Sequence, residues 1–274
     1  AEADVAIVVV GSTTEWETEG EDRSTMDLPG RQAELVSAVA VANPRTILVL
    51  NVGAPVTTGW SSEVGATLLA WLPGQEAGGA LADVLFGDAD PSGRLPTSFP
   101  VRATDNLADA GFPGVDGHLP YGEGLLLGYR HHDTDDVAPA FCFGHGLSYT
   151  TFAYADPELV TGADGRPAVR VIVTNLGSRA GRAVVQAYAE PSARSEGAPV
   201  QQLVGFESVE IAAGESTVVD LALDSRAWTH WSEETGGWAF ETAPVAIHVA
   251  SSSRDRHGSV TLDPATGPPR FAGE

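Results

Sequence analysis

The stretch Ala66-Thr67-Leu68-Leu69-Ala70-Trp71-Leu72-Pro73-Gly74 is an apolar run that ends at a proline and a glycine. The segment that follows, 75–86, places Leu81, Val84 and Leu85 on one face at helical spacing. An apolar strand followed at once by an amphipathic helix is the repeating unit of α/β folds. This stretch therefore predicts an α/β architecture, in which the elements on either side alternate in the same way.

The N-terminal half of the chain continues this alternation. Residues 5–10 and 46–52 are short apolar runs typical of buried strands. Between them, apolar residues at helical spacing predict a helix that opens at Pro29 and ends before Asn43-Pro44. We expect a three-layer α/β sandwich with a mainly parallel sheet.

The sequence changes character toward its C-terminus. From residue 87 to about 149, glycine, proline and aspartate are frequent and predict extended loops over the α/β core. Beyond them, short β-rich runs separated by turn residues predict a small β-sandwich at about 151–265; the runs are 169–174, 183–189, 217–223 and 245–250. The predicted fold class is thus α/β plus all-β, with domains at 1–150 and 151–274.

Composition excludes several functions. The 15 basic and 37 acidic residues give a formal charge of −22, which disfavours nucleic acids and anionic membranes as partners. All 15 basic residues are arginine, so Schiff-base lysine chemistry is excluded. No apolar run is long enough for a transmembrane helix, and the single Cys142 cannot form an internal disulfide. We expect a soluble chain, cytoplasmic or secreted, with no membrane partner.

The loop after the first predicted strand is the candidate site. It reads Glu15-Trp16-Glu17-Thr18-Glu19-Gly20-Glu21-Asp22-Arg23, with four glutamates within seven positions. In open α/β sheets, ligands bind outside the carboxyl ends of the strands, where this loop lies. Crowded carboxyl groups hold a proton to higher pH than isolated ones, which suits a general acid. The alternative is a solvated acidic loop in which Asp22 and Arg23 pair locally.

Further motifs support a resemblance over nearly the whole chain. In order they are Trp16 to Arg23 with Leu28-Pro29 and Gln32; 71–79 with 82–88 and Pro91-Ser92-Gly93-Arg94-Leu95-Pro96; Phe143-Gly144-His145-Gly146-Leu147-Ser148-Tyr149-Thr150; and Gln201-Gln202-Leu203-Val204-Gly205-Phe206. Together they resemble the C-terminal portion of glycoside hydrolase family 3, the β-glucosidase family. This resemblance implies that the second domain is fibronectin type III-like, an immunoglobulin-like β-sandwich.

The resemblance also implies an activity. Members of the family are retaining glycosidases, in which one carboxylate attacks the anomeric carbon and another protonates the leaving oxygen. The nucleophile is an aspartate on a (β/α)8 barrel, and nothing in this chain resembles that barrel. The general acid/base is assigned to Glu19, because its spacing to Arg23 matches the family's Glu-Gly-x-Asp-Arg pattern; Glu17 is the alternative. Trp16 is a candidate for stacking on a sugar ring. The alternative is that its side chain only packs within the protein.

Several expectations follow from this assignment. The substrate is a β-glucoside or oligosaccharide, a barrel domain or subunit is the partner, and the isolated chain is inactive. The sequence leaves open whether the protein forms a homo-oligomer. No cofactor is expected, and no metal either, because neighbouring side chains such as those of His131-His132-Asp133 usually point apart. The rival hypothesis is a non-catalytic carbohydrate-binding or assembly module that has kept the fold.

Overall fold

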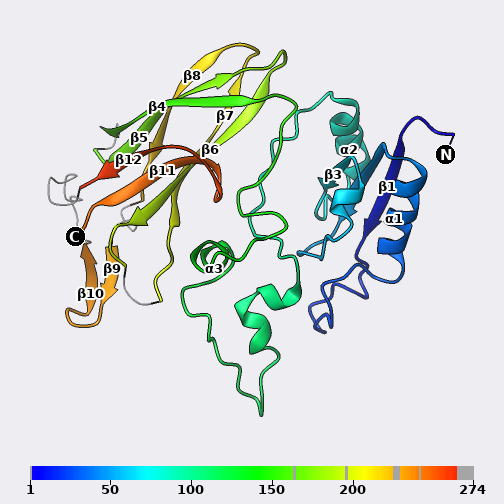
Figure 1. The fold of residues 1–274 in the computed structure, drawn as a ribbon, viewed down its shortest axis with the longest axis horizontal. Helices are drawn as coiled ribbons and strands as arrows, with labels where there is room; N and C mark the ends of the chain where they lie inside the picture. The colour runs from blue at the N-terminus through cyan, green and yellow to red at the C-terminus, as the bar shows by residue number, and fades with distance from the viewer. Residues whose placement is uncertain (1, 163–164, 195–196, 225–228, 241, 264–274) are drawn as a thin grey trace. The chain divides into compact units, whose positions relative to one another are not determined.

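The computed structural model describes residues 2–162, 165–194, 197–224, 229–240 and 242–263 (Figure 1). The chain forms two compact units that interleave along the sequence. The α/β unit comprises Ala1–Asp88, Ser98–Pro120 and Ala138–Phe141; the sandwich unit comprises Ala89–Thr97, Tyr121–Val137 and Cys142–Glu274. The C-terminal stretch after Asp263, which belongs to the predicted second domain, lies outside the described residues.

The α/β unit is built on a parallel three-stranded sheet of order β1-β2-β3. Its elements are β1 (Ala6–Gly11), α1 (Gln32–Ala42), β2 (Thr46–Asn51), the short 3-10 helix η1 (Ser61–Glu63), β3 (Ala66–Leu69) and α2 (Ala77–Phe86). In Figure 1, α1 and α2 flank the three strands from opposite sides. Because the strands are parallel, their carboxyl ends share one edge of the sheet, where β1 and β2 both enter loops.

Packing follows the apolar spacing of the sequence. Val36 and Ala40 lie four residues apart on α1, and both are buried, while α1 contacts β1 and β2. In β1, Val8 and Val10 are buried, whereas Ile7 and Val9, which alternate with them, are exposed. One face of this edge strand is therefore covered within the unit, and the other is open.

The element ends differ from the predicted ones by a few residues. The strand predicted to reach residue 72 stops at Leu69, and Trp71 has a positive φ of 52°, a backbone conformation that breaks a strand. The two helices begin two or three residues later than predicted, at Gln32 and Ala77. Gly87 ends α2 in the left-handed conformation with φ 84°, which glycine adopts without steric cost.

The predicted loop region contains only short helices. They are η2 (Ala103–Asp105), η3 (Leu107–Ala110) and α3 (Tyr129–Thr134). The segment that carries α3 is fixed to the sandwich by Arg254, whose Nε donates to Asp133 at 2.8 Å and whose Nη2 donates to the His132 carbonyl. Tyr129 stacks on Phe143, with ring centroids 4.5 Å apart. It also meets the edge of the fully buried Tyr188 on the sheet.

Two antiparallel sheets and a hairpin make up the rest of the sandwich unit (Figure 1). The sheet of order β12-β11-β6-β7 contains β6 (Gly181–Pro191), β7 (Gln202–Ile211), β11 (Val245–Ser252) and β12 (Asp255–Leu262); the sheet of order β4-β5-β8 contains β4 (Phe152–Thr161), β5 (Pro167–Asn175) and β8 (Ser216–Ala222); β9 (Thr229–Ser232) pairs with β10 (Gly237–Phe240).

The core between the sheets is formed by alternate residues of the strands. Val169, Val171 and Val173 of β5 face Val245, Ile247 and Val249 of β11 within one cluster. The predicted fold class, α/β plus a β-sandwich, is confirmed. The β-rich runs of the sequence predicted four of the sandwich strands, β5, β6, β8 and β11, and the motif 201–206 overlaps β7. The strands β4 and β12 and the β9–β10 hairpin were missed, because polar and charged residues interrupt their apolar alternation.

Candidate functional site

The acidic loop leaves β1 at Gly11 and is fixed at its start by Gln32 on α1. The Gln32 side-chain amide accepts from the Gly11 N–H at 2.7 Å and donates to the Gly11 carbonyl at 2.8 Å. A β-carbon on Gly11 would lie 2.1 Å from the Asn51 carbonyl oxygen, so only glycine fits beside β2 here. Position 32 therefore sets the exit of the loop from the sheet.

Glu17 clamps the loop to the end of β2. Its carboxylate accepts from the backbone N–H groups of Gly53 at 2.8 Å and Ala54 at 3.1 Å. The Ser12 hydroxyl donates to the same carboxylate at 2.5 Å. A β-carbon on Gly53 would lie 3.0 Å from Glu17 Oε2, so a small residue is needed for this approach. Glu17 thus joins the carboxyl ends of two neighbouring strands.

Arg23 completes this clamp, and its partner differs from the predicted one. The prediction that Asp22 and Arg23 pair with each other is wrong. Arg23 instead lies 3.5 Å from Glu17 Oε1 and donates to the Pro55 carbonyl at 3.1 Å. The reason is geometric, because the guanidinium points back to the strand ends while Asp22 is exposed to solvent.

Glu19 occupies the tip of the loop. Thr18 and Glu21 form an isolated antiparallel bridge, which leaves Glu19 and Gly20 as the two residues of the turn between them. The Glu19 side chain is exposed. Glu17 is thus held by four groups. Glu19 extends from the turn that Glu17 anchors.

Trp16 lies one residue before the clamp. Its backbone N–H donates to the Thr13 carbonyl at 2.9 Å, and its side chain is partly exposed. The indole Nε1 is buried and has no hydrogen-bond partner among the described residues. An N–H that solvent cannot reach is unable to bind a ligand, so contact with a sugar would have to use the ring face.

The histidine pair is engaged in local contacts. His131 Nδ1 lies 2.7 Å from Asp135 Oδ2, and His132 Nδ1 lies 3.0 Å from the Val137 carbonyl. Asp133 accepts from Gln201 and Arg254. Within the part of the chain that the structure describes, no three His, Cys, Asp or Glu side chains gather in an arrangement that could hold a metal ion.

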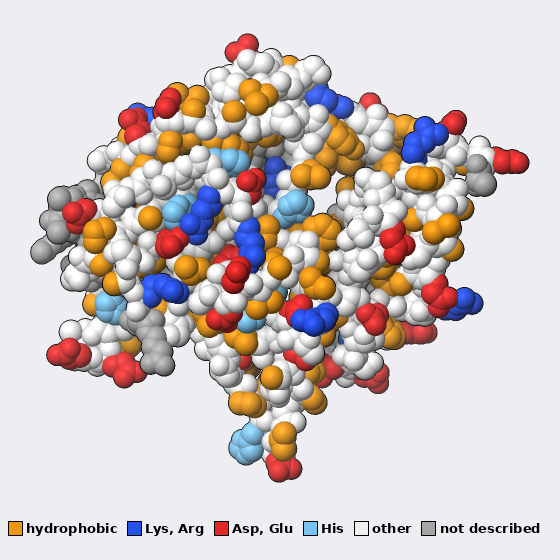
Figure 2. All heavy atoms as spheres, in the orientation of Figure 1, with side chains coloured by type: hydrophobic (Ala, Val, Ile, Leu, Met, Phe, Trp, Pro, Cys, Tyr) orange, Lys and Arg blue, Asp and Glu red, His pale blue; other side chains and the backbone are white. Residues whose placement is uncertain are grey.

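The chain is rich in acidic residues, with 37 Asp and Glu side chains. Figure 2 shows Asp and Glu side chains scattered over the visible face, with Arg and His side chains among them. No described helix combines the length and the apolar content that crossing a membrane requires.

Models of known protein families match both parts of the chain. The model of the glycosyl hydrolase family 3 C-terminal domain matches residues 1–149, and that of the fibronectin type III-like domain matches residues 183–253. The first match covers more than half of the sequence and includes the whole acidic loop. The chain belongs to glycoside hydrolase family 3, as the motifs of the sequence indicated.

Relatives and solved structures agree with this family. A β-glucosidase of Rhizobium radiobacter is 44% identical over 268 residues, which are 95% of this chain and 32% of that protein. The crystal structure of DesR, a β-glucosidase from Streptomyces venezuelae in complex with D-glucose, matches with a TM-score of 0.90 at 41% identity and covers 95% of this chain and 34% of that one. A β-glucosidase from Kluyveromyces marxianus matches with a TM-score of 0.90 at 39% identity, covering 95% and 32%. The chain thus spans about a third of the length of these relatives.

Sequence reasoning missed the partners of Glu17. Ser12, Gly53 and Ala54 carry no charge, and two of them act through backbone N–H groups. The one available signal was the position of Gly53, directly after a predicted strand that neighbours the acidic loop.

Proposed function

We propose that this chain is the C-terminal portion of a retaining β-glucosidase and supplies the general acid/base for cleavage of β-glucosidic bonds. The observation that carries this proposal is the membership of family 3 together with an exposed glutamate at the tip of an anchored loop. The nucleophile is then a carboxylate outside this chain, on a (β/α)8 barrel. The β-glucoside specificity is inferred from the names of the relatives.

The geometry favours Glu19 over Glu17 as the acid/base. A general acid has to reach the glycosidic oxygen and exchange its proton twice in each turnover. Glu17 already accepts from two backbone N–H groups and a hydroxyl, and giving up these contacts would unfasten the loop. Glu19 is exposed and can approach a substrate without such a loss.

The chemistry divides between the two glutamates. Glu19 protonates the leaving oxygen as the nucleophile attacks, and its carboxylate then takes a proton from the water that releases the sugar. Glu17, with Arg23, holds the loop in place during both steps. The ring face of Trp16 is the candidate for contact with the sugar or its leaving group.

The test uses the intact enzyme with Glu19→Ala, Glu17→Ala and Asp22→Ala, the last being a matched acidic control in the same loop. Loss of a positioned acid lowers the rate on alkyl glucosides by about 10²- to 10⁴-fold. The rate on a dinitrophenyl glucoside falls far less, because dinitrophenolate leaves without a proton. Azide then restores turnover of Glu19→Ala and yields a β-glucosyl azide, since an anionic nucleophile needs no base.

Three results would change the assignment. Azide rescue confined to Glu17→Ala would move the acid/base to that residue. Rescue in neither variant would remove the loop from the chemistry. Turnover of 4-nitrophenyl β-glucoside by this chain alone, tracking the purified protein, would mean that it holds a complete site and that no barrel is needed.

Whether the chain associates with a barrel domain or subunit distinguishes the catalytic function from the non-catalytic alternative. We expect the chain to be found joined to a barrel, either in one polypeptide or as a subunit that co-purifies with it. A monodisperse chain without such a partner, inactive under all conditions, would favour a carbohydrate-binding or assembly module.

A further inference from the structure

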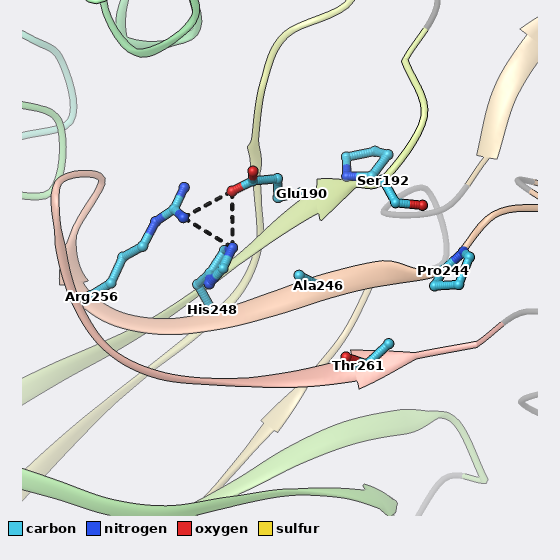
Figure 3. A pocket seen from close by; sticks show the side chains of 8 residues that line it. Glu190, Ser192, Pro244, Ala246, His248, Arg256 and Thr261 are labelled. Carbon is cyan, nitrogen blue, oxygen red and sulfur yellow. Dashed lines mark hydrogen bonds and ion pairs between the residues drawn. The ribbon is translucent and has the colours of Figure 1, made fainter.

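A hollow lies on the outer face of the four-stranded sheet in the sandwich unit (Figure 3). Its volume is about 340 Å³, and its lining includes Glu190, Pro191, Pro244, Ala246, His248 and Arg256. Glu190 on β6 is registered with Ala246 on β11, so these residues share one face of the sheet. The segment carrying α3 meets this face at Tyr188, next to His248 in the register.

Three polar side chains converge in the hollow. Figure 3 shows Glu190, His248 and Arg256 pointing toward one another from three strands. Arg256 Nη1 lies 2.8 Å from Glu190 Oε2, and His248 Nε2 lies 3.0 Å from the same oxygen. Arg256 Nη1 is also 3.1 Å from His248 Nε2. The Glu190 and Arg256 side chains remain about one third exposed, at 34% and 37%, so a ligand can reach both.

A buried relay fixes the orientation of this cluster. Arg256 Nη2 donates to Gln201 Oε1 at 2.8 Å, and Gln201 is 2% exposed. Gln201 Nε2 in turn donates to Asp133 at 2.9 Å and to the Ser253 carbonyl at 2.7 Å. The guanidinium is therefore held between a buried amide and a carboxylate before any ligand arrives. Such preorganisation is what a binding site requires, because little freedom is lost on binding.

The charges indicate the class of ligand. Burial lowers the pKa of His248 and the Arg256 charge lowers it further, while Glu190 acts in the opposite sense; the net direction is downward, which favours the uncharged ring at neutral pH. The cluster of one carboxylate, one guanidinium and one neutral imidazole then has no net charge. An anion would meet the carboxylate and a cation the guanidinium. A hydroxyl group suits both, because it donates to Glu190 and accepts from Arg256.

The rest of the lining of the hollow also suits a ligand that carries hydroxyl groups. Pro191, Pro244 and Ala246 present aliphatic surface beside the polar cluster. A pyranose ring has the matching combination of hydroxyls at its edge and C–H groups on its faces. We propose that this hollow is a binding site for a neutral saccharide, formed by residues other than those of the acidic loop. The proposal does not depend on the hydrolytic function, because it rests on contacts in the sandwich unit alone.

The experiment is photoaffinity labelling of the intact protein with a 1-thio-β-glucoside that carries a diazirine. A thioglycoside resists hydrolysis, so the result does not depend on catalysis. After digestion at arginine, label from the hollow appears in peptides 183–194 and 227–254. Excess thiocellobiose, which also resists hydrolysis, removes it, whereas excess sulfate does not. Glu190→Ala lowers labelling of both peptides about tenfold, as expected for loss of a hydrogen bond to a charged group.

The matched control is Arg170→Ala, which breaks the exposed ion pair with Asp220 on the other sheet and leaves labelling unchanged. If Glu190→Ala does not fold, Glu190→Gln keeps the size of the side chain and still lowers labelling. Label absent from both peptides would overturn the proposal. So would label that persists in the folded Glu190 variants, or label that sulfate displaces. Because labelling and turnover are measured separately, a failure here leaves the proposed glycosidase function untouched.

Discussion

Ile247 in the sandwich unit and Ile7 in the α/β unit are the same residue type in the middle of a strand, yet the first is fully buried and the second is 50% exposed. Ile247 lies in a cluster of buried apolar residues whose exposed fractions are 6% or less. Around Ile7, Val9 is 62% exposed, and Val41 at the end of α1 is 85% exposed. The core between the sandwich sheets is therefore covered by strands on both sides, whereas β1 leaves the apolar side chains of one face exposed.

The two units therefore differ in how their sheets are covered, and the acidic loop belongs to the unit whose edge strand β1 has an open face. Parallel strands are normally apolar on both faces because both faces are covered. In β1 the described residues cover one face only. Apolar surface of this kind marks a place where other protein packs. The sheet that carries the acidic loop thus has an edge strand with an uncovered apolar face, whereas the core between the two sandwich sheets is filled from both sides.

The largest expected effect compares the two isoleucines directly. Ile247→Ala removes fully buried methyl groups and should lower the free energy of unfolding by about 2–5 kcal/mol. Ile7→Ala should cost about 1 kcal/mol or less, because half of the side chain is already exposed. Urea denaturation of the intact protein measures both. Equal losses would break the comparison and mean that the rest of the protein covers Ile7.

The second prediction compares the two glutamates of the loop. Glu17→Ala should lower the free energy of unfolding by about 1–3 kcal/mol, because it leaves the Gly53 and Ala54 N–H groups without their acceptor. Glu19→Ala should change it by about 0.5 kcal/mol at most. Thermal unfolding checks the pair. Equal stability of the two variants would contradict the clamp that the Glu17 contacts describe.

The third prediction concerns acid and the sandwich unit, which holds His132, His145 and His248. Burial is the first cause that lowers the pKa of each. A lowered pKa in the folded state means that the unfolded chain binds more protons, so stability is full above about pH 6.5 and falls as the pH drops below it. Hydrogen-exchange protection factors in β6 and β11, which are corrected for the intrinsic exchange rate at each pH, should therefore fall between pH 7 and pH 5.

His132→Gln provides the control for this pH effect. His132 is 1% exposed, and glutamine keeps a polar side chain that does not titrate in this range. The variant should lose less stability between pH 7 and pH 5 than the unaltered protein. An identical loss in both proteins would remove His132 as a contributor.

The smallest effect is expected on the sandwich surface. Arg170 makes a bidentate ion pair with Asp220, at 2.7 and 2.8 Å, but both side chains are more than 40% exposed. Solvent screening leaves such a pair with little net energy. Arg170→Ala should not shift the urea midpoint measurably. A clear shift would show that surface pairing, in addition to the core, stabilises this unit.

Much of the fold could be predicted because its signals are local. The apolar runs 46–52 and 245–250 predicted β2 and β11 to within two residues, since burial imposes a repeat on residues that are neighbours in sequence. The predicted ends of helices and strands were less accurate. The positive φ of Trp71 ends β3 early, and no composition signal marks it. The hairpin of β9 and β10 was missed because each of its strands is only 4 residues long and polar residues such as His230 interrupt the apolar pattern.

The sequence by itself determined the family, the two kinds of fold and the loop in which the candidate acid/base lies. The family's spacing favoured Glu19 over Glu17, but only the tertiary structure shows that these glutamates, two positions apart, have different contacts. Their difference comes from backbone N–H groups 36 and 37 residues away. Likewise, Glu190, His248 and Arg256 come together only when three strands align. The physical reason is that apolar periodicity is encoded locally, whereas the partners of a charged side chain are set by which strands lie side by side.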